Sequence, residues 1–169
     1  RYKKSVLNYA LRILGNRADA EDVLSDVFLA VFGRKYRFEA QAKFSTWAFA
    51  VTRNMCIDKI RKRKRFLPLV FRNEGAQQTE EWDPPDTKAL PREDLERSET
   101  AHHVQSAIQK LPLEQKEAIV LREYHQMSYE EISTVLNCSL AKVKVLNFRA
   151  REDLKIKLWS SLEGDNRHG

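Results

Sequence analysis

The sequence predicts an all-α protein built from two small helical domains joined by a linker. Apolar residues recur three and four positions apart through most of residues 2–65 and again through residues 99–162, which is the spacing of helices that bury one face. Only 5 of the 169 residues are Gly and 5 are Pro, which argues against a loop-rich fold. Four of the prolines fall within residues 66–98, so the helical pattern is interrupted near the middle of the chain.

Charge is distributed unevenly along the chain. The composition, 42% hydrophobic and 32% charged, is that of a soluble globular protein, and the formal net charge is +6. Residues 1–65 hold 16 Lys and Arg against 6 Asp and Glu, a net charge of +10, whereas residues 66–98 carry −4 and residues 99–169 are neutral. A basic first third is expected if this part of the chain binds a polyanion such as nucleic acid.

Two helices are expected before residue 34. The first covers residues 2–14 and ends at Gly15, since glycine readily adopts the left-handed conformation of a C-cap. The second starts at Asp19, whose side chain can cap it, and ends at Gly33. Its apolar positions, which should face the core of an N-terminal three-helix bundle, are Ala20, Val23, Leu24, Val27, Phe28, Val31 and Phe32.

The other face of the second helix is acidic. It carries Glu21, Asp22, Ser25 and Asp26. Negative charge is favoured near a helix N-terminus, so this face can be simply solvated. It can also be a docking surface for a basic partner, and the residues alone leave both interpretations open.

Residues 44–65 are predicted to form the central helix of the N-terminal bundle. The helix opens with Phe44 and Trp47, and Ser45 can cap it. Six of the seven positions in residues 59–65 are basic. A basic run is often only a solvated face. The aromatic residues favour nucleic-acid binding, because rings can stack on unpaired bases while Lys and Arg hold phosphates.

Residues 66–98 are predicted to be an acidic, Pro-containing linker, because they lack a sustained apolar period.

Cys56 and Cys138 stand in helical patterns and form no CxxC pair, so we expect buried thiols in a reducing compartment. With no signal peptide and no apolar run that could span a bilayer, a cytoplasmic protein is expected. The chain does not begin with Met, so we expect that a leading segment is missing.

Residues 99–162 are predicted to form a helix-turn-helix domain, followed by a tail at residues 163–169. Ser128 and Glu131 have the spacing of a capping box. Asn137 suits the tight turn that follows, and the helix after the turn is basic. A short helix, a tight turn and a longer basic helix are typical of a domain that places its last helix in the DNA major groove. A plain helical hairpin is the alternative.

Three segments resemble one family, the bacterial RNA polymerase sigma factors of the extracytoplasmic-function group within the sigma-70 family. ADAEDVLSDVFLAVF resembles the part of the second conserved region that contacts the polymerase clamp helices. FSTWAFAVTRNMCIDKIRKRKR resembles the part that melts and recognises the minus-ten promoter element. LPLEQKEAIVLREYHQMSYEEISTVLNCSLAKVKVLNFRARE resembles the fourth region, which recognises the minus-thirty-five element. The order and spacing of these segments match the family over nearly the whole chain.

The resemblance implies roles for individual residues. The positions that would bind core polymerase are Asp22, Ser25, Asp26 and Phe28, with Ser25 where a Gln is usual. Those that would bind minus-ten DNA are Phe38, Lys43, Phe44, Trp47, Arg53, Asn54, Asp58 and Arg61. Those that would bind minus-thirty-five DNA are Ser139, which can also cap the last helix, and Lys142, Lys144, Asn147, Arg149 and Arg151.

The last helix departs from the family at five positions. Ala141 and Lys142 replace the usual Gly-Thr, Val145 and Leu146 replace Ser-Arg, and Asn147 replaces an apolar residue. We infer from these departures that the minus-thirty-five sequence is unusual.

The resemblance implies an alternative sigma factor that directs promoter-specific transcription initiation, has no catalysis of its own and is held inactive by an anti-sigma factor. The expected partners are core RNA polymerase, promoter DNA in duplex and melted form, and an anti-sigma factor. We expect no cofactor, no metal and no membrane insertion.

Two other classes of protein are possible from the residues. A stand-alone helix-turn-helix regulator would leave the acidic face near Asp22 and the helix that carries Trp47 unexplained. A nuclease would need clustered carboxylates for metal, or a nucleophile with its base, and apart from that acidic face the sequence has neither. His102 and His103 are adjacent, so they point to different helix faces and make a poor metal pair.

Overall fold

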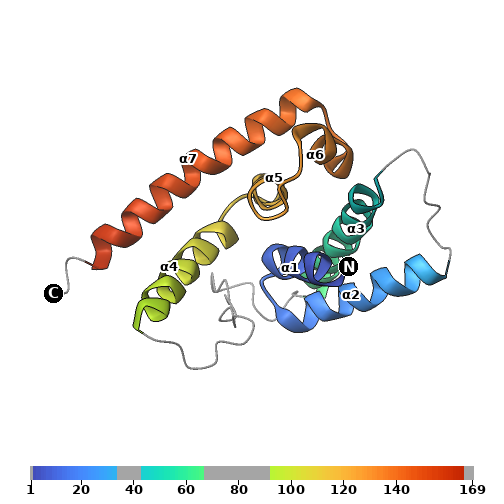
Figure 1. Ribbon diagram of the computed structural model, residues 1–169, viewed down its shortest axis with the longest axis horizontal. Coiled ribbons are helices and arrows are strands. Elements are labelled where there is room, and N and C mark those ends of the chain that lie inside the picture. Colours follow the sequence, from blue (N-terminus) through green and yellow to red (C-terminus); the bar gives the residue numbers. More distant parts are fainter. Residues whose placement is uncertain (1, 34–42, 67–91, 166–169) are drawn as a thin grey trace.

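The computed structural model describes residues 2–33, 43–66 and 92–165, which form seven helices and no strand (Figure 1). The helices are α1 (Lys3–Leu14), α2 (Arg17–Phe32), α3 (Phe44–Phe66), α4 (Arg92–Gln109), α5 (Leu113–Glu123), α6 (Tyr129–Leu136) and α7 (Leu140–Asp165). The all-α prediction is therefore confirmed. Phe38, one of the residues expected near minus-ten DNA, lies outside the described residues.

Helices α1, α2 and α3 pack together as an N-terminal bundle. Their shared core includes Tyr9, Val23 and Cys56, which are fully buried. Burying an aliphatic side chain such as that of Val23 stabilises the fold by about 1.5–3 kcal/mol. Helix α1 ends as predicted at Gly15, whose φ of 70° is left-handed and whose N–H donates to the Leu11 carbonyl oxygen.

Helix α2 begins earlier than predicted. Its N-cap is Asn16 rather than Asp19, because Asn16 Oδ1 accepts a hydrogen bond of 2.8 Å from the Asp19 N–H. Asn16 has the extended backbone that an N-cap requires, whereas Asp19 is already inside the first turn. Ser45 likewise lies inside α3, which starts one residue before it. All three residue types are good caps, so sequence preference alone could not rank them.

Helix α2 carries more apolar side chains than the bundle covers. Those that are buried are Ala20, Val23, Leu24, Val27 and Ala30. Phe28 and Phe32, which we predicted to face the core, are 38% and 80% exposed, and Leu29 is 71% exposed. The prediction for these two phenylalanines was wrong because α1 and α3 cover only one stripe of α2, and the VFLAVF run is apolar on every side.

Helices α5, α6 and α7 pack together, with α4 against α7. The capping box is confirmed, since Ser128 Oγ accepts from the Glu131 N–H and the Glu131 carboxylate accepts from the Ser128 N–H. Asn137 has the left-handed backbone (φ 50°) expected for the turn. Ser139 Oγ accepts a hydrogen bond from the Lys142 N–H at the start of α7, also as predicted.

Two helices extend beyond the predicted limits. Helix α4 begins at Arg92, inside the stretch expected to be linker, and α7 continues past Trp159 to Asp165. The added segments, REDLERSE and SSLEGD, are mostly polar. They lack the apolar period from which helices were predicted, so the pattern could not reveal them. The rest of the predicted linker, residues 67–91, lies outside the described residues.

Both cysteines are free thiols. Cys56 is fully buried as predicted, and burial raises its pKa to about 12, so this thiol is a poor nucleophile at neutral pH. Cys138 was also predicted to be buried, but it is only half-buried. None of the described helices is both long and apolar enough to cross a membrane.

Asn147, one of the residues expected to bind minus-thirty-five DNA, lies inside the C-terminal unit. Its side chain is 1% exposed because it falls on the same stripe of α7 as the buried Val143, Leu146 and Ala150. Its Nδ2 donates to the Val143 carbonyl oxygen, and its Oδ1 is buried with no hydrogen-bond partner among the described residues. The surface that α7 presents to solvent therefore does not include this amide.

Ser128→Ala should lower the free energy of unfolding by about 1 kcal/mol, because the Glu131 N–H loses its capping acceptor. In a thermal unfolding scan the melting temperature should fall by about 2–4 °C. Ser106→Ala, at an exposed position of α4, is the matched control and should change stability by less than about 0.5 kcal/mol. Equal losses in the two variants would show that the capping box contributes nothing specific.

Asn147→Leu should raise the free energy of unfolding by about 1 kcal/mol, because it removes a buried acceptor that has no partner. Leu has the same side-chain branching, and circular dichroism should show a melting temperature about 2–4 °C higher. Asn54→Leu makes the same change at an exposed position of α3 and should have little effect. A lower melting temperature for Asn147→Leu would mean that the bond to Val143 outweighs the orphaned oxygen.

Candidate nucleic-acid interface

The basic end of α3 lies along the acidic face of α2. Lys59 Nζ is 3.0 Å from Asp19 Oδ1 and 2.7 Å from Asp22 Oδ2. Arg63 approaches the same Asp19 carboxylate at 4.0 Å. The hydrogen bond to Asp22 raises the pKa of Lys59 above its usual value. Part of the basic run and part of the acidic face are thus neutralised by each other inside the N-terminal bundle.

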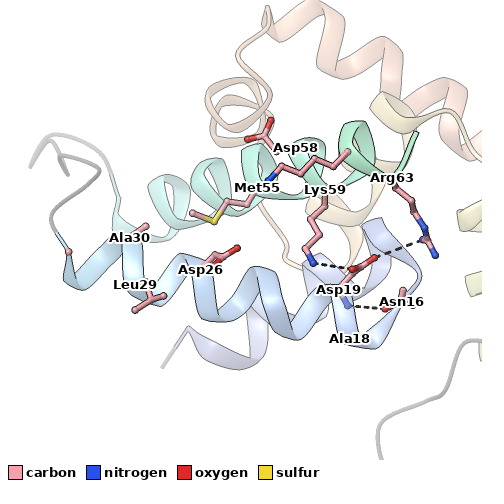
Figure 2. Close-up of a pocket in the computed structure, with 12 residues that line it drawn as sticks. Asn16, Ala18, Asp19, Asp26, Leu29, Ala30, Met55, Asp58, Lys59 and Arg63 are labelled. Carbon is pink, nitrogen blue, oxygen red and sulfur yellow. Dashed lines mark hydrogen bonds and ion pairs between the residues drawn. The ribbon is translucent and has the colours of Figure 1, made fainter. Parts of the chain in front are cut away.

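A cleft of about 1130 Å³ lies between α2 and α3 (Figure 2). Its lining includes Asp26 and Leu29 from α2 and Met55 and Asp58 from α3. Lys59, Lys62 and Arg63 also line it, so the cleft offers apolar surface beside charges of both signs. It also brings Asp26, predicted to bind polymerase, and Asp58, predicted to bind minus-ten DNA, to one site.

The predicted polymerase-binding residues Asp22, Ser25 and Asp26 are all exposed on α2. Ser25 Oγ donates to the Glu21 carbonyl oxygen of the same helix. The exposed Phe28 and Phe32 rings stack with centroids 6.4 Å apart. We call Asp22, Asp26, Phe28, Leu29 and Phe32 the α2 surface. Leu29 and Phe32 were not among the contact residues predicted from the sequence. A signal was available, because the VFLAVF run contains more apolar residues than one buried helix face can hold.

Three aromatic rings meet at the start of α3. The Phe44 ring centroid lies 5.4 Å from that of Trp47 and 5.2 Å from that of Tyr2. Phe44 and Trp47 are half-buried and Tyr2 is 36% exposed, so the rings are held in place yet remain partly accessible. Such a platform can stack on unpaired bases. Tyr2 was not among the predicted site residues.

The polar and charged residues predicted to bind minus-ten DNA do not share one environment. Asn54, Asp58 and Arg61 are exposed, and Arg61 Nη1 lies 3.9 Å from Asp58 Oδ1, an exposed pair that adds little stability. Lys43 and Arg53 instead contact the C-terminal unit. Lys43 Nζ lies 2.8 Å from Glu131 Oε1, and Arg53 Nε lies 3.0 Å from Glu117 Oε1.

The exposed face of α7 carries the predicted minus-thirty-five residues other than Asn147, which is buried, and Ser139, which directly precedes the helix. Lys142 is paired with Glu114 at 2.7 Å, and Arg151 is paired with Glu123 at 2.7 Å. Lys144 and Arg149 are exposed and form no ion pair among the described residues. Val145 and Phe148 are 46% and 66% exposed on the same face. Apolar groups on a recognition helix can contact thymine methyl groups.

The described residues show no chemistry suited to a metal site. Among them, no group of three or more His, Cys, Asp or Glu side chains could hold a metal ion. The carboxylates of Asp19 and Asp22 are instead bound to Lys59.

Solved structures share this fold. The sigma factor RpoE in complex with the anti-sigma factor NepR from Bartonella quintana superposes with a TM-score of 0.70 at 23% identity, covering 92% of this chain and 91% of that one. CnrH in complex with the cytosolic domain of CnrY superposes with a TM-score of 0.63 at 26% identity, covering 93% of this chain and 82% of that one.

Sequence relatives and family models agree with the fold. ECF RNA polymerase sigma factor SigW of Bacillus subtilis is 30% identical over 158 residues, which are 93% of this chain and 84% of that protein. RNA polymerase sigma factor YlaC of the same organism is 28% identical over 163 residues, 96% of this chain and 90% of that protein. Sigma-70 region 2 matches residues 1–66, and Sigma-70, region 4 matches residues 102–154. The chain therefore belongs to the sigma-70 family, among the extracytoplasmic-function RNA polymerase sigma factors.

Proposed function

We propose that this chain is an alternative sigma factor that acts in the cytoplasm, binds core RNA polymerase and directs it to a specific set of promoters. It has no catalytic activity of its own. The observation that carries this proposal is the presence, in one chain, of a basic helix with an aromatic platform and a helix-turn-helix unit with an exposed basic helix.

We assign one role to each part of the chain. Residues 1–65 bind core polymerase and open the minus-ten element. Residues 66–98 link the two domains. Residues 99–162 bind the minus-thirty-five element, and residues 163–169, which begin with the last residues of α7, follow this domain as a tail.

The α2 surface is the proposed contact with core polymerase. Exposed acidic side chains beside exposed Phe28, Leu29 and Phe32 suit a partner that is basic and partly apolar. Apolar patches of this kind are uncommon on monomers unless they bind another protein. Asp22 is already paired with Lys59, so Asp26 supplies the carboxylate that does not need to break a pair first.

Promoter opening is assigned to α3 and the residues just before it. Flipping a base out of the duplex costs a few kcal/mol of unstacking, which stacking on the rings of Phe44 and Trp47 can offset. Phosphates of the separated strand would be held by cations of α3 such as Arg61, which is exposed. Asn54 is exposed on the same helix and can hydrogen-bond a base edge.

An anti-sigma partner is proposed as the regulator. CnrH, which is 26% identical and shares the fold, was solved with the cytosolic domain of CnrY, and RpoE was solved with the anti-sigma factor NepR. A protein that covers both the α2 surface and α7 would block both proposed contacts at once.

Transcription on a pool of random promoters tests the proposed function. Core polymerase with this chain should give new start sites that share two upstream elements, and core polymerase alone should not. The pool would also identify the promoter sequence. If transcription by core polymerase is unchanged while the chain alone selects duplex sites, it is a conventional regulator and not a sigma factor.

Arg149→Ala should weaken binding to the upstream element selected from that pool and reduce the slope of log K against log salt by about one. Arg149 is exposed, so it can neutralise a phosphate without giving up a partner. Arg151→Ala is the matched control, because Arg151 already forms an ion pair with Glu123 and should change the slope less. Equal slopes in the parent and Arg149→Ala would remove this residue from the interface.

A further inference from the structure

The outward face of α7 is apolar where the helix begins. Ala141, Val145 and Phe148 are four and three positions apart, so they lie along one line of the helix surface. All three are exposed, Val145 by 46% and Phe148 by 66%. Val143 and Ala150 lie on the opposite side of the helix and are fully buried. We call Ala141, Val145 and Phe148 the α7 stripe, which faces away from the C-terminal unit.

Burial divides the five positions at which α7 departs from the family. Leu146 and Asn147 are 7% and 1% exposed, so neither side chain can reach a base. Lys142 is exposed, but its ammonium group is held by a carboxylate of α5. The two that remain are Ala141 and Val145, which stand where Gly and Ser are usual, and each adds apolar surface to the stripe.

Two cations flank the α7 stripe. Lys144 and Arg149 are exposed and form no ion pair among the described residues. With 3.6 residues per turn, they lie on opposite sides of the stripe. An apolar line between two cations fits the major groove of duplex DNA, whose edges carry phosphates and whose floor is made of bases. Helix α6 and the tight turn at Asn137 precede α7, as in units that place such a helix in this groove (Figure 1).

Thymine is the base that presents a methyl group in the major groove. The other groups on the groove floor are mainly hydrogen-bond donors and acceptors, which an apolar side chain deprives of water without replacing the bond. Val145 and Phe148 are three residues apart, about 4.5 Å along the helix axis, and the rise of one base pair is about 3.4 Å. The two side chains can therefore contact the methyl groups of neighbouring thymines.

We infer that Val145 and Phe148 recognise thymine methyl groups, so that the upstream element bound by this chain has thymines in neighbouring base pairs. This inference rests on the proposed function and names the base chemistry by which α7 selects a promoter. The flanking Lys144 and Arg149 are left to bind phosphates on either side of those base pairs.

Replacing thymidine by deoxyuridine tests the inference, because it removes the methyl group and keeps the base pairing. The probes are fluorescein-labelled duplexes of the upstream element selected from the random-promoter pool, with deoxyuridine at one thymine position at a time. Fluorescence anisotropy reports their binding to core polymerase carrying the chain of residues 1–169. We expect deoxyuridine to weaken binding about fourfold at each of two neighbouring positions, as the loss of one buried methyl group does.

Variants assign each methyl contact to a side chain. Val145→Ser restores the residue that is usual in the family and should abolish the deoxyuridine penalty at one of the two positions. Phe148→Ala should abolish it at the other. Both side chains are exposed, so circular dichroism should show the helix content of the parent chain. A side chain with only a structural role would weaken binding of the thymine and deoxyuridine probes equally.

Ile156→Ser is the matched control. Ile156 is 66% exposed and lies close to three turns beyond Val145 on the same side of α7, roughly 16 Å further along the helix. It is past the N-terminal part of the helix, which supplies the base contacts in helix-turn-helix units. Both deoxyuridine penalties should equal those of the parent chain. If Ile156→Ser also abolishes them, the recognition of methyl groups by Val145 and Phe148 is wrong.

Transcription separates this inference from the proposed function. If the chain directs new start sites but deoxyuridine weakens binding at no position of the upstream element, the proposed function stands and methyl recognition is wrong. If no start site appears but the chain alone selects duplex sites, the same probes are made from those sites. Penalties that the two variants abolish would then support methyl recognition and reject the sigma-factor proposal. If the chain selects no duplex with or without polymerase, both are wrong.

Discussion

The contact between Arg53 and Glu117 is the constraint that links the two helical units. It joins α3 to α5 across 64 positions of sequence. A carboxylate buried without a partner would be costly, so as long as Glu117 stays buried a cation of α3 must stay beside it. Burial raises the pKa of Glu117 and the charge of Arg53 acts against that shift. Arg12 and Lys43 make further contacts across the same boundary, with Gln105 and Glu131.

Ion pairing decides which of the many basic side chains are available to a polyanion. Lys59, Lys142 and Arg151 hold carboxylates of their own unit, whereas Lys144 and Arg149 are exposed and form no ion pair among the described residues. A phosphate must displace an existing partner in the first group and only water in the second. The net charge of +10 in residues 1–65 therefore overstates the charge that α3 can present.

Surplus apolar side chains mark the other proposed contacts. Helix α2 exposes Leu29 and Phe32, and α7 exposes Phe148, although each helix also buries a complete apolar stripe. A helix that is apolar on more than one face has more apolar surface than its own bundle can cover. These are the surfaces that we propose are covered by polymerase and by DNA.

Local chemistry was sufficient to predict much of this protein from its sequence. The spacing of apolar residues predicted most of the helices, and the Ser128 capping box, the turn at Asn137 and the C-cap at Gly15 were confirmed because each depends on residues a few positions apart. The order of motifs likewise led to the family. Local patterns failed at the start of α2, where Asn16 and Asp19 are equally good N-cap residues. They also failed where a helix continues through polar residues, as α4 does from Arg92.

Only the tertiary structure decided which side chains are accessible. It placed Asn147 inside the C-terminal unit and Phe32 outside the bundle, and it paired Arg53 with Glu117. A helical period states that a residue lies on a certain face, but the face is buried only where another element packs against it. Contacts between residues far apart in the chain leave no periodic signal, so the division of charged residues into paired and available ones could not be predicted from the sequence.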